Sequence, residues 1–331
     1  MKKLLVLAIS ILVLTAFGSF AFILFNNIYK DEGNFDDRRD NAPVVNVDET
    51  EQVLKITSDV GELVEDWNHT YRVMAHALGG IDNYDYTNSL EAFYQNYNEG
   101  TRLFEIDLDT TSDGDICLIH TWEDFRNKLT DIGGDWPMST EEFKKAKIHG
   151  KYKTVMFKDL LELMNEIPDF YIIIDSKTFD IEGSEVMYNK MIEEVDSVNP
   201  ELINRIIPQA YTPDMYVFLD ENYDFNKIIF TLYHYYVDSD GQKIYQFVKE
   251  HKVPVVVMHM DNEWATKVIT DIYAYAEMQD YEDQFTIYIH TVNQIDKALK
   301  IINDNHFFGV YSDFITEEAL QQTILHEKDL N

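Results

Sequence analysis

The sequence predicts an α/β protein, a (β/α)8 or TIM barrel with a small β-hairpin insertion after its second strand and an N-terminal transmembrane helix before the barrel. Three observations predict this fold. Short runs rich in β-branched and aromatic residues recur from residue 72 onward, as is typical of strands buried on both faces. Helical periods separate these runs. Eight such runs occur within about 250 residues, the usual length of this barrel.

The eight expected strands share an apolar, largely unbroken composition and lie at 72–77, 102–108, 170–176, 205–211, 227–234, 253–259, 285–291 and 307–313. The seven expected helices lie between them, at 88–100, 157–166, 182–198, 213–222, 240–251, 262–279 and 293–305. Asp113-Gly114, after the second strand, is typical of a hairpin turn. A doubly wound open sheet is the alternative fold, but no glycine-rich phosphate-binding fingerprint follows the first strand.

An uncharged apolar run of 22 residues follows Lys2 and Lys3 at the N-terminus. This run, 4–25, is longer than the apolar region of a signal peptide and long enough to cross a bilayer. Because the two lysines favour the cytoplasmic side, we expect a single-pass protein of the cell membrane whose bulk is extracytoplasmic. A cleaved signal peptide is the alternative, and it would make the protein secreted.

The chain is therefore expected to divide into three parts. Residues 1–30 would form the membrane anchor or signal peptide, and residues 31–68 an acidic tether with a candidate helix at 49–67. Residues 69–331 would form the barrel, which carries the chemistry.

The composition narrows the classes of partner and cofactor. Acidic residues number 60 and basic residues 27, and the net charge of -33 argues against nucleic acid, whose binding depends on Lys and Arg. An anionic substrate is still allowed, since a bound cation can reverse the local field. The single cysteine, Cys117, can form neither an internal disulfide nor a zinc–cysteine site.

Polar and titratable residues gather at the carboxyl ends of the expected strands, where a barrel carries its active site. Glu105 and Asp107 stand two residues apart and so share one face of a strand. With Asp175 from the neighbouring strand they would form a three-carboxylate oxygen site, which suits Mg²⁺ or Ca²⁺ better than Zn²⁺. The other strand-end residues are His76, His120, Lys177, Gln209, His234, His259, His290 and Asp313.

A structural role is the competing interpretation for each of these residues. An isolated histidine at a strand end is more often structural than catalytic, and we keep that interpretation for His234 and His259. Glu105 and Asp107 alone could be a solvated strand end. Because these two carboxylates occur together with the other strand-end groups, a functional site is favoured.

The motifs around these residues resemble those of the glycerophosphodiester phosphodiesterases, relatives of the phosphatidylinositol-specific phospholipases C. That family reads I-A-H-R-G, E-N-T-x-x-A-F, G-x-x-x-x-E-x-D-V and T-x-D-G-x-x-V-x-H-D near its start. The corresponding segments here are MAHALGG, TNSLEAF, GTRLFEIDL and TSDGDICLIHT. The later segments IIIDSK, IPQAY, IHTVNQ and GVYSD resemble the family's remaining strand ends, so the resemblance extends from residue 72 to about 315.

The resemblance implies a role for each matching position. The catalytic pair would be His76 and His120. The metal ligands would be Glu105, Asp107 and Asp175, with Ca²⁺ or Mg²⁺ as the divalent cation. The substrate-binding residues would be Lys177 beside the phosphate, Asn88, Gln209 and His290.

The chain departs from the family's pattern around the first histidine and in the pocket. Ala77 stands where the family has its phosphate-binding arginine, and loss of a bidentate guanidinium weakens phosphate binding. Thr87 replaces a glutamate, Asp175 replaces a longer glutamate, and His290 replaces a tryptophan. The insertion GGIDNYDY also lengthens the first loop. We therefore expect a divergent subgroup with a specialised pocket.

These features predict an extracytoplasmic, metal-dependent phosphodiesterase that uses histidine general acid–base catalysis. Its substrate would be a glycerophosphodiester or a phospholipid or polyol-phosphate head group, and its N-terminal anchor would bind the membrane. Two alternatives stay open. One is a non-catalytic ligand-binding protein on the same barrel, and the other is a barrel glycosidase that acts through paired carboxylates.

Overall fold

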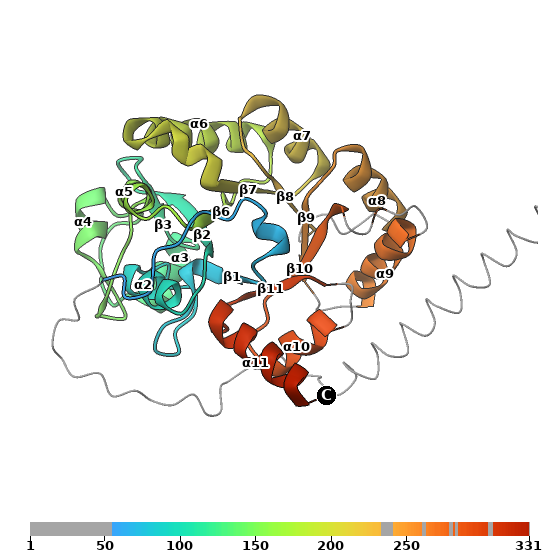
Figure 1. The fold of residues 1–331 in the computed structure, drawn as a ribbon. Helices are drawn as coiled ribbons and strands as arrows, with labels where there is room; N and C mark the ends of the chain where they lie inside the picture. Colours follow the sequence, from blue (N-terminus) through green and yellow to red (C-terminus); the bar gives the residue numbers. More distant parts are fainter. Residues whose placement is uncertain are drawn as a thin grey trace, which may run out of the picture.

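Eight parallel strands close into a barrel in the computed structural model, which describes residues 55–330 except 233–240, 260–262, 278–280, 282–283 and 304–306. In barrel order they are β1 (Val73–Ala75), β2 (Leu103–Thr110), β6 (Tyr171–Asp175), β7 (Ile206–Ala210), β8 (Ile229–Thr231), β9 (Val255–His259), β10 (Thr286–His290) and β11 (Gly309–Ser312). Pairing of β1 with both β2 and β11 completes the circle (Figure 1). Each strand overlaps one of the predicted apolar runs, so the predicted TIM barrel is confirmed.

Helices surround the barrel (Figure 1). Those that match predicted stretches are α2 (Leu90–Asn98), α5 (Phe157–Glu166), α6 (Ile181–Val198), α7 (Pro213–Asn222), α8 (Gly241–Glu250), α9 (Glu263–Glu277) and α10 (Ile295–Asn303). The sequence pattern does not predict α4 (Thr140–Lys145) or α11 (Glu317–Leu330). α4 is too short for a periodic signal, and only the capping box of Ser139 and Glu142 marks its start.

The predicted hairpin after the second strand is present. β2 pairs antiparallel with β3 (Ile116–Leu118), and the turn holds Gly114 at a φ of 87°, which glycine adopts without strain. The chain continues through α3 (Trp122–Asp124) and α4 into a second small sheet of β4 (Lys147–Ile148) and β5 (Tyr152–Lys153). The insertion is therefore larger than the hairpin alone.

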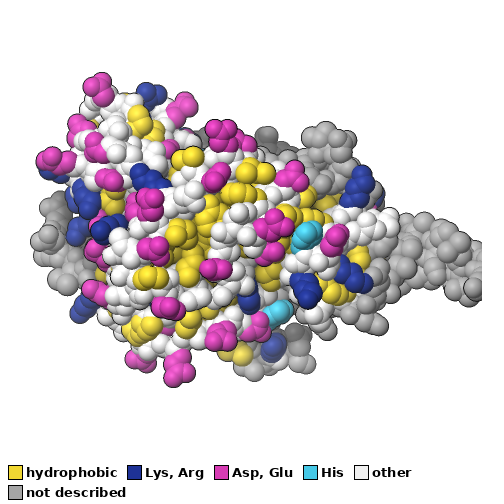
Figure 2. Space-filling model, turned by 90° about the horizontal axis from the view of Figure 1, so that it is seen from above, with side chains coloured by type: hydrophobic (Ala, Val, Ile, Leu, Met, Phe, Trp, Pro, Cys, Tyr) yellow, Lys and Arg dark blue, Asp and Glu magenta, His cyan; other side chains and the backbone are white. Residues whose placement is uncertain are grey.

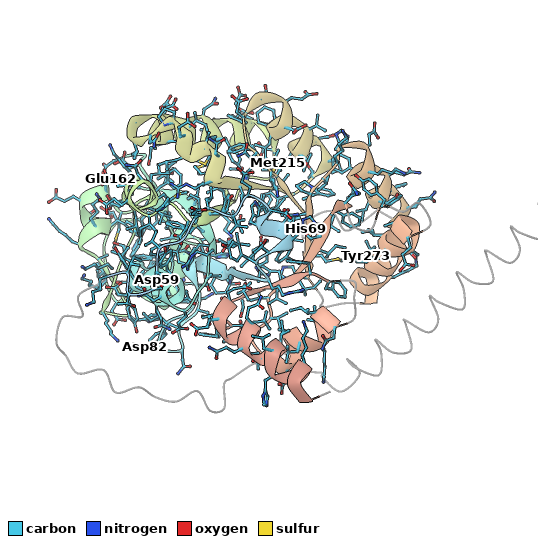
Figure 3. The ribbon with its side chains drawn as sticks, in the orientation of Figure 1. Asp59, His69, Asp82, Glu162, Met215 and Tyr273 are labelled. Carbon is cyan, nitrogen blue, oxygen red and sulfur yellow. The ribbon has the colours of Figure 1, made fainter. Side chains whose placement is uncertain are left out.

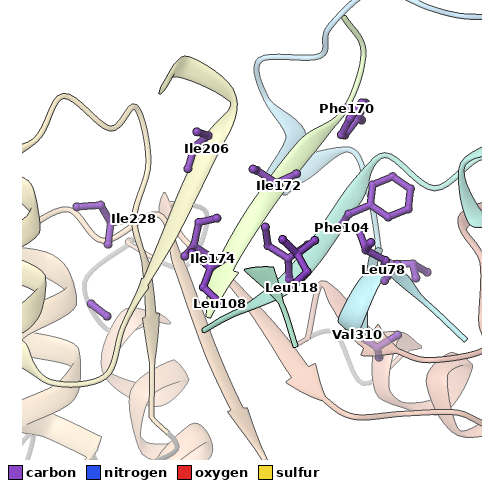
Figure 4. Packing of buried hydrophobic residues seen from close by; sticks show 14 of the residues in the cluster. Leu78, Phe104, Leu108, Leu118, Phe170, Ile172, Ile174, Ile206, Ile228 and Val310 are labelled. Carbon is purple, nitrogen blue, oxygen red and sulfur yellow. The ribbon is translucent and has the colours of Figure 1, made fainter. Parts of the chain in front are cut away.

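Side chains along each barrel strand alternate between two apolar layers. Ile172, Ile174 and Ile206 belong to the outer layer, which packs against the helices (Figure 4). The inner layer consists of Met74, Leu103, Tyr171, Ile173, Ile207, Ile229, Val255, Val257, Tyr288 and Tyr311. Two positions farther along the same strands stand His76, Glu105, Asp175, Gln209, Thr231, His259, His290 and Asp313. The polar end of the barrel interior is thus a continuation of the same alternation.

The segment just before β1 closes the amino-terminal end of the barrel. Trp67 is buried with its ring 6.1 Å from that of Tyr171, and Leu63 packs on the inner layer. The candidate helix at 49–67 is wrong over residues 55–66, which hold no helix. The reason is that backbone N–H groups in this stretch donate to barrel side chains instead of to helical carbonyls, as Gly61 does to Asp169.

The predicted anchor, 1–30, and the first part of the tether lie outside the described residues. Among the residues that the structure does describe, no helix combines the length and the apolar character needed to span a membrane.

Candidate active site

Three carboxylates meet at the carboxyl end of the barrel. Glu105 and Asp107 come from β2 and Asp175 ends β6, and the pairing of these strands sets Asp107 directly beside Asp175. Each residue offers one carboxylate oxygen, and these oxygens lie within 4.8 Å of one another. Glu105 and Asp107 are 2% and 0% exposed, so this is no solvated strand end. The convergence predicted from the sequence is confirmed.

Neighbouring side chains orient these carboxylates. The Lys177 ammonium lies 2.6 Å from Asp107 Oδ1 and also pairs with Asp175. Asn88 Nδ2 donates to Asp107 Oδ2 at 2.8 Å, and the Tyr211 hydroxyl donates to Asp175 Oδ1. Because each contact comes from a different loop or strand, several segments hold the cluster together.

The charge balance of the cluster fits a hard divalent cation. Burial and repulsion from Asp107 raise the pKa of Glu105 to about 8. Burial acts in the same direction on Asp107, but the combined attraction to Lys177, His76 and His120 outweighs burial and lowers the pKa of that carboxyl. A buried carboxylate is stable only when it is paired or coordinated, and the donor set is all oxygen. Glu105, Asp107 and Asp175 therefore fit Mg²⁺ or Ca²⁺.

His76 is held beside this cluster by a buried carboxylate. Its Nδ1 lies 2.7 Å from Oδ1 of Asp313, and Asn293 Nδ2 donates to the other oxygen of Asp313 at 2.7 Å. Burial disfavours the charged imidazolium, but attraction to Asp313 and the hydrogen bond outweigh burial and raise the pKa of His76 to about 9. His76 is consequently cationic at neutral pH, with Nδ1 engaged and Nε2 left for proton transfer.

The raised pKa of His76 predicts a pH-dependent stability. The stabilisation is fully present below the ordinary value of 6.5 and is lost as the pH rises to about 9, a difference worth about 3 kcal/mol. In chelator, the free energy of unfolding in urea should therefore fall more steeply from pH 6 to 9.5 for the wild type than for Asp313→Asn. Parallel curves for the two proteins would contradict the assignment of the shift to Asp313.

His120 approaches the site from the hairpin rather than from a barrel strand. Its Nδ1 lies 2.6 Å from Asp124 Oδ2, and its side chain is one-third exposed. The Tyr86 ring lies between the two histidines, with its centroid 4.5 Å from that of His76 and 5.2 Å from that of His120. The two residues predicted as a catalytic pair thus flank one aromatic ring.

The predicted pocket residues lie at different depths. The His290 ring lies between the rings of His76 and His259, at 4.7 and 4.6 Å. Burial and repulsion from His76 hold the pKa of His290 well below its usual range, so it is neutral. Gln209 is buried and accepts a hydrogen bond from the Tyr311 hydroxyl at 3.4 Å. His234 falls outside the described residues.

The sequence pattern singles out neither Tyr86 nor Tyr211 nor Asp124 as site residues. For Tyr211 a signal exists, because it stands two residues after Gln209, just beyond the end of β7 at the carboxyl end of the barrel. Tyr86 belongs to the loop insertion. Because that insertion has neither a helical nor a strand period in its sequence, its conformation could not be predicted. At the position of the missing arginine, the backbone N–H of Ala77 donates to Glu105 Oε2 at 2.7 Å.

Comparison with solved structures supports the barrel fold. A glycerophosphodiester phosphodiesterase from Parabacteroides distasonis is 16% identical, with a TM-score of 0.57, and the match covers 78% of this chain and 98% of that one. The glycerophosphodiester phosphodiesterase from Thermotoga maritima is 19% identical, with a TM-score of 0.53, and the match covers 78% of this chain and 99% of that one. An Oleispira antarctica phosphodiesterase, solved in complex with the product sn-glycerol-3-phosphate, is 16% identical, with a TM-score of 0.56. That match covers 76% of this chain and 96% of the other.

A search of curated proteins finds no significant match. The family comparison is decisive instead, because residues 79–302, which span most of the barrel, match the profile described as the glycerophosphoryl diester phosphodiesterase family. The chain belongs to this family of phosphodiester hydrolases.

Proposed function

We propose that the protein is an extracytoplasmic, metal-dependent phosphodiesterase that cleaves a glycerophosphodiester or a phospholipid or polyol-phosphate head group. The observation that carries this proposal is the meeting of Glu105, Asp107, Asp175 and Lys177 with His76 at the carboxyl end of the barrel. Carboxylates that can hold a cation, an ammonium and a cationic histidine supply what phosphoryl chemistry requires.

The carboxylate cluster and Lys177 would bind the phosphate. A divalent cation held by Glu105, Asp107 and Asp175 supplies positive charge for a non-bridging phosphate oxygen. Burial opposes the charge of Lys177, but the surrounding carboxylates outweigh burial and raise its pKa, so the ammonium persists at all relevant pH. Lys177 is therefore a permanent cation for the substrate, although it lacks the bidentate geometry of the missing arginine.

The two histidines would exchange protons with the reacting oxygens. His76, cationic at neutral pH, would donate its Nε2 proton to the leaving alcohol oxygen as the phosphorus–oxygen bond breaks. His120, oriented by Asp124, would accept the proton of the attacking oxygen. That oxygen belongs to water in a direct hydrolysis and to a substrate hydroxyl in a cyclising cleavage. Both routes use the same two proton transfers.

The acidic surface bears on the choice of substrate and location. Figure 2 shows carboxylate side chains scattered over one face, between apolar and basic side chains. Such a surface repels anionic lipid, so a lipid head group would be recognised through the cation. A tether to the membrane would offset this repulsion by keeping the barrel near its substrate, and Ca²⁺ is the divalent cation that we propose outside the cell.

The test is hydrolysis by the purified full chain with and without chelator. The substrates are glycerophosphodiesters, phosphatidylinositol and an aryl phosphodiester, and Ca²⁺ and Mg²⁺ are each added back. We expect turnover that chelator abolishes and one cation restores. Turnover that persists in chelator would exclude the metal-dependent mechanism.

The missing arginine favours one second candidate, a non-catalytic binding protein on the same barrel. The product seen in the Oleispira antarctica phosphodiesterase, sn-glycerol-3-phosphate, provides a probe for it. If this compound binds in the presence of cation while no substrate is turned over, the protein is a non-catalytic binding protein.

A further inference from the structure

The loop that follows His76 is built to hold one conformation. It runs from Gly79 to Thr87, and a Cβ at Gly79 would meet the Asn96 side chain at 2.3 Å. Asn96 Nδ2 in turn lies within hydrogen-bonding distance of the carbonyls of Leu78 and Gly80. The tip is closed by reciprocal backbone hydrogen bonds between Ile81 and Tyr84, at 2.9 and 2.7 Å. The loop therefore packs tightly against α2.

The tip of this loop is attached to the small β4–β5 sheet. Figure 3 labels Asp82 at the end of the loop, and its carboxylate accepts from both Lys151 and the Tyr152 hydroxyl. The Tyr84 ring stacks on His149, with centroids 3.7 Å apart. The insertion thus has fixed points at its base and at its tip, and Tyr86 lies between them.

Tyr86 occupies a conformation that the surrounding contacts must maintain. Its φ is 54°, in the left-handed region that a bulky side chain adopts at a cost. The ring meets both histidines edge to face, and the residue is 37% exposed, so part of it is accessible to a substrate. Strain held in place at a functional site is typical of a residue that is positioned for a purpose.

The hydroxyl of Tyr86 stays a hydrogen-bond donor. Burial raises the pKa of this phenol, and the charges of Asp313, Asp107 and Glu105 raise it further. A neutral phenol whose ring lies beside the two histidines can donate its O–H to an anion bound there.

We propose that the Tyr86 hydroxyl binds the phosphate of the substrate and takes over part of the role of the arginine that Ala77 replaces. The O–H donates to a non-bridging phosphate oxygen, while the ring keeps the two histidines apart and excludes water from one side. The inference rests on the proposed function. It also relates the loop insertion to the alanine that stands two residues before it.

The test compares Tyr86→Phe with the wild type and with Tyr84→Phe. Tyr86→Phe keeps the ring contacts and removes only the hydroxyl, and Tyr84→Phe does the same in the same loop away from the histidines. Loss of a hydrogen bond to a charged group should lower kcat/KM about 10- to 100-fold in Tyr86→Phe. Binding of sn-glycerol 3-phosphate, measured by calorimetry with cation present, should weaken in parallel. Tyr84→Phe should match the wild type.

The outcomes separate this inference from the proposed function. If the wild type turns over substrate and Tyr86→Phe equals it in both kcat/KM and product affinity, the inference is overturned and the proposed function stands. If the wild type shows no turnover, the proposed function fails, and the calorimetry alone decides: weaker binding by Tyr86→Phe supports the phosphate contact, and equal or absent binding overturns it. Melting temperatures of the three proteins check that the loop has kept its fold.

Discussion

Replacing His76 by Asn should lower kcat by about 100- to 10,000-fold, the usual contribution of a general acid. Asn retains a side-chain amide near the place of Nδ1, so the hydrogen bond to Asp313 can persist while the Nε2 proton is lost. The melting temperature at neutral pH should also fall, because the variant loses the buried ion pair with Asp313 and the ring contacts with Tyr86 and His290. Steady-state kinetics with an aryl phosphodiester measure the effect.

The matched control for this variant is His69→Asn. His69 also pairs through Nδ1 with an aspartate, Asp66, at 2.8 Å, but it lies just before β1 at the opposite end of the barrel. It should retain full activity. If His76→Asn kept the activity of the wild type, His76 would have no role in proton transfer, whatever the state of the metal site.

Replacing Asp107 by Asn should weaken cation binding by at least about 100-fold, since even indirect partners of metal ligands contribute 10- to 100-fold. The side chain is fully buried and belongs to the same cluster as Glu105 and Asp175, so its charge contributes directly to the site. The amide keeps the volume but loses one anionic oxygen. Calorimetric titration with Ca²⁺ and Mg²⁺ gives the affinities directly, and turnover should fall with cation occupancy.

Asp109→Asn provides the control in the same strand. Asp109 is also partly buried, but its Oδ1 accepts from the backbone N–H of Thr110 and it lies outside the three-carboxylate cluster. Its cation affinity should equal that of the wild type. An Asp107→Asn protein that titrates like Asp109→Asn would remove Asp107 from the ligand set.

The barrel and the members of its carboxylate cluster are predictable from the amino-acid pattern alone. Side chains on a strand alternate with a period of two, so the inner apolar residues of each run place the next polar residue inside the barrel as well. Leu103 on the inner face thus predicts Glu105 and Asp107 on that face, and Tyr171 predicts Asp175 in the same way. Parallel pairing of neighbouring strands then brings them together, because their carboxyl ends lie at one edge.

The residues that contact the two histidines are known only from the three-dimensional fold. His76 and Asp313 are 237 positions apart, and they meet because β1 pairs with β11 when the barrel closes. Tyr86 and His120 come from two loops whose courses depend on side-chain anchors such as the one between Asp82 and Lys151. Loops carry no periodicity, and their conformation follows from contacts with distant residues. For this reason the strand-borne cluster was predictable, and the aromatic contact that joins the two histidines was not.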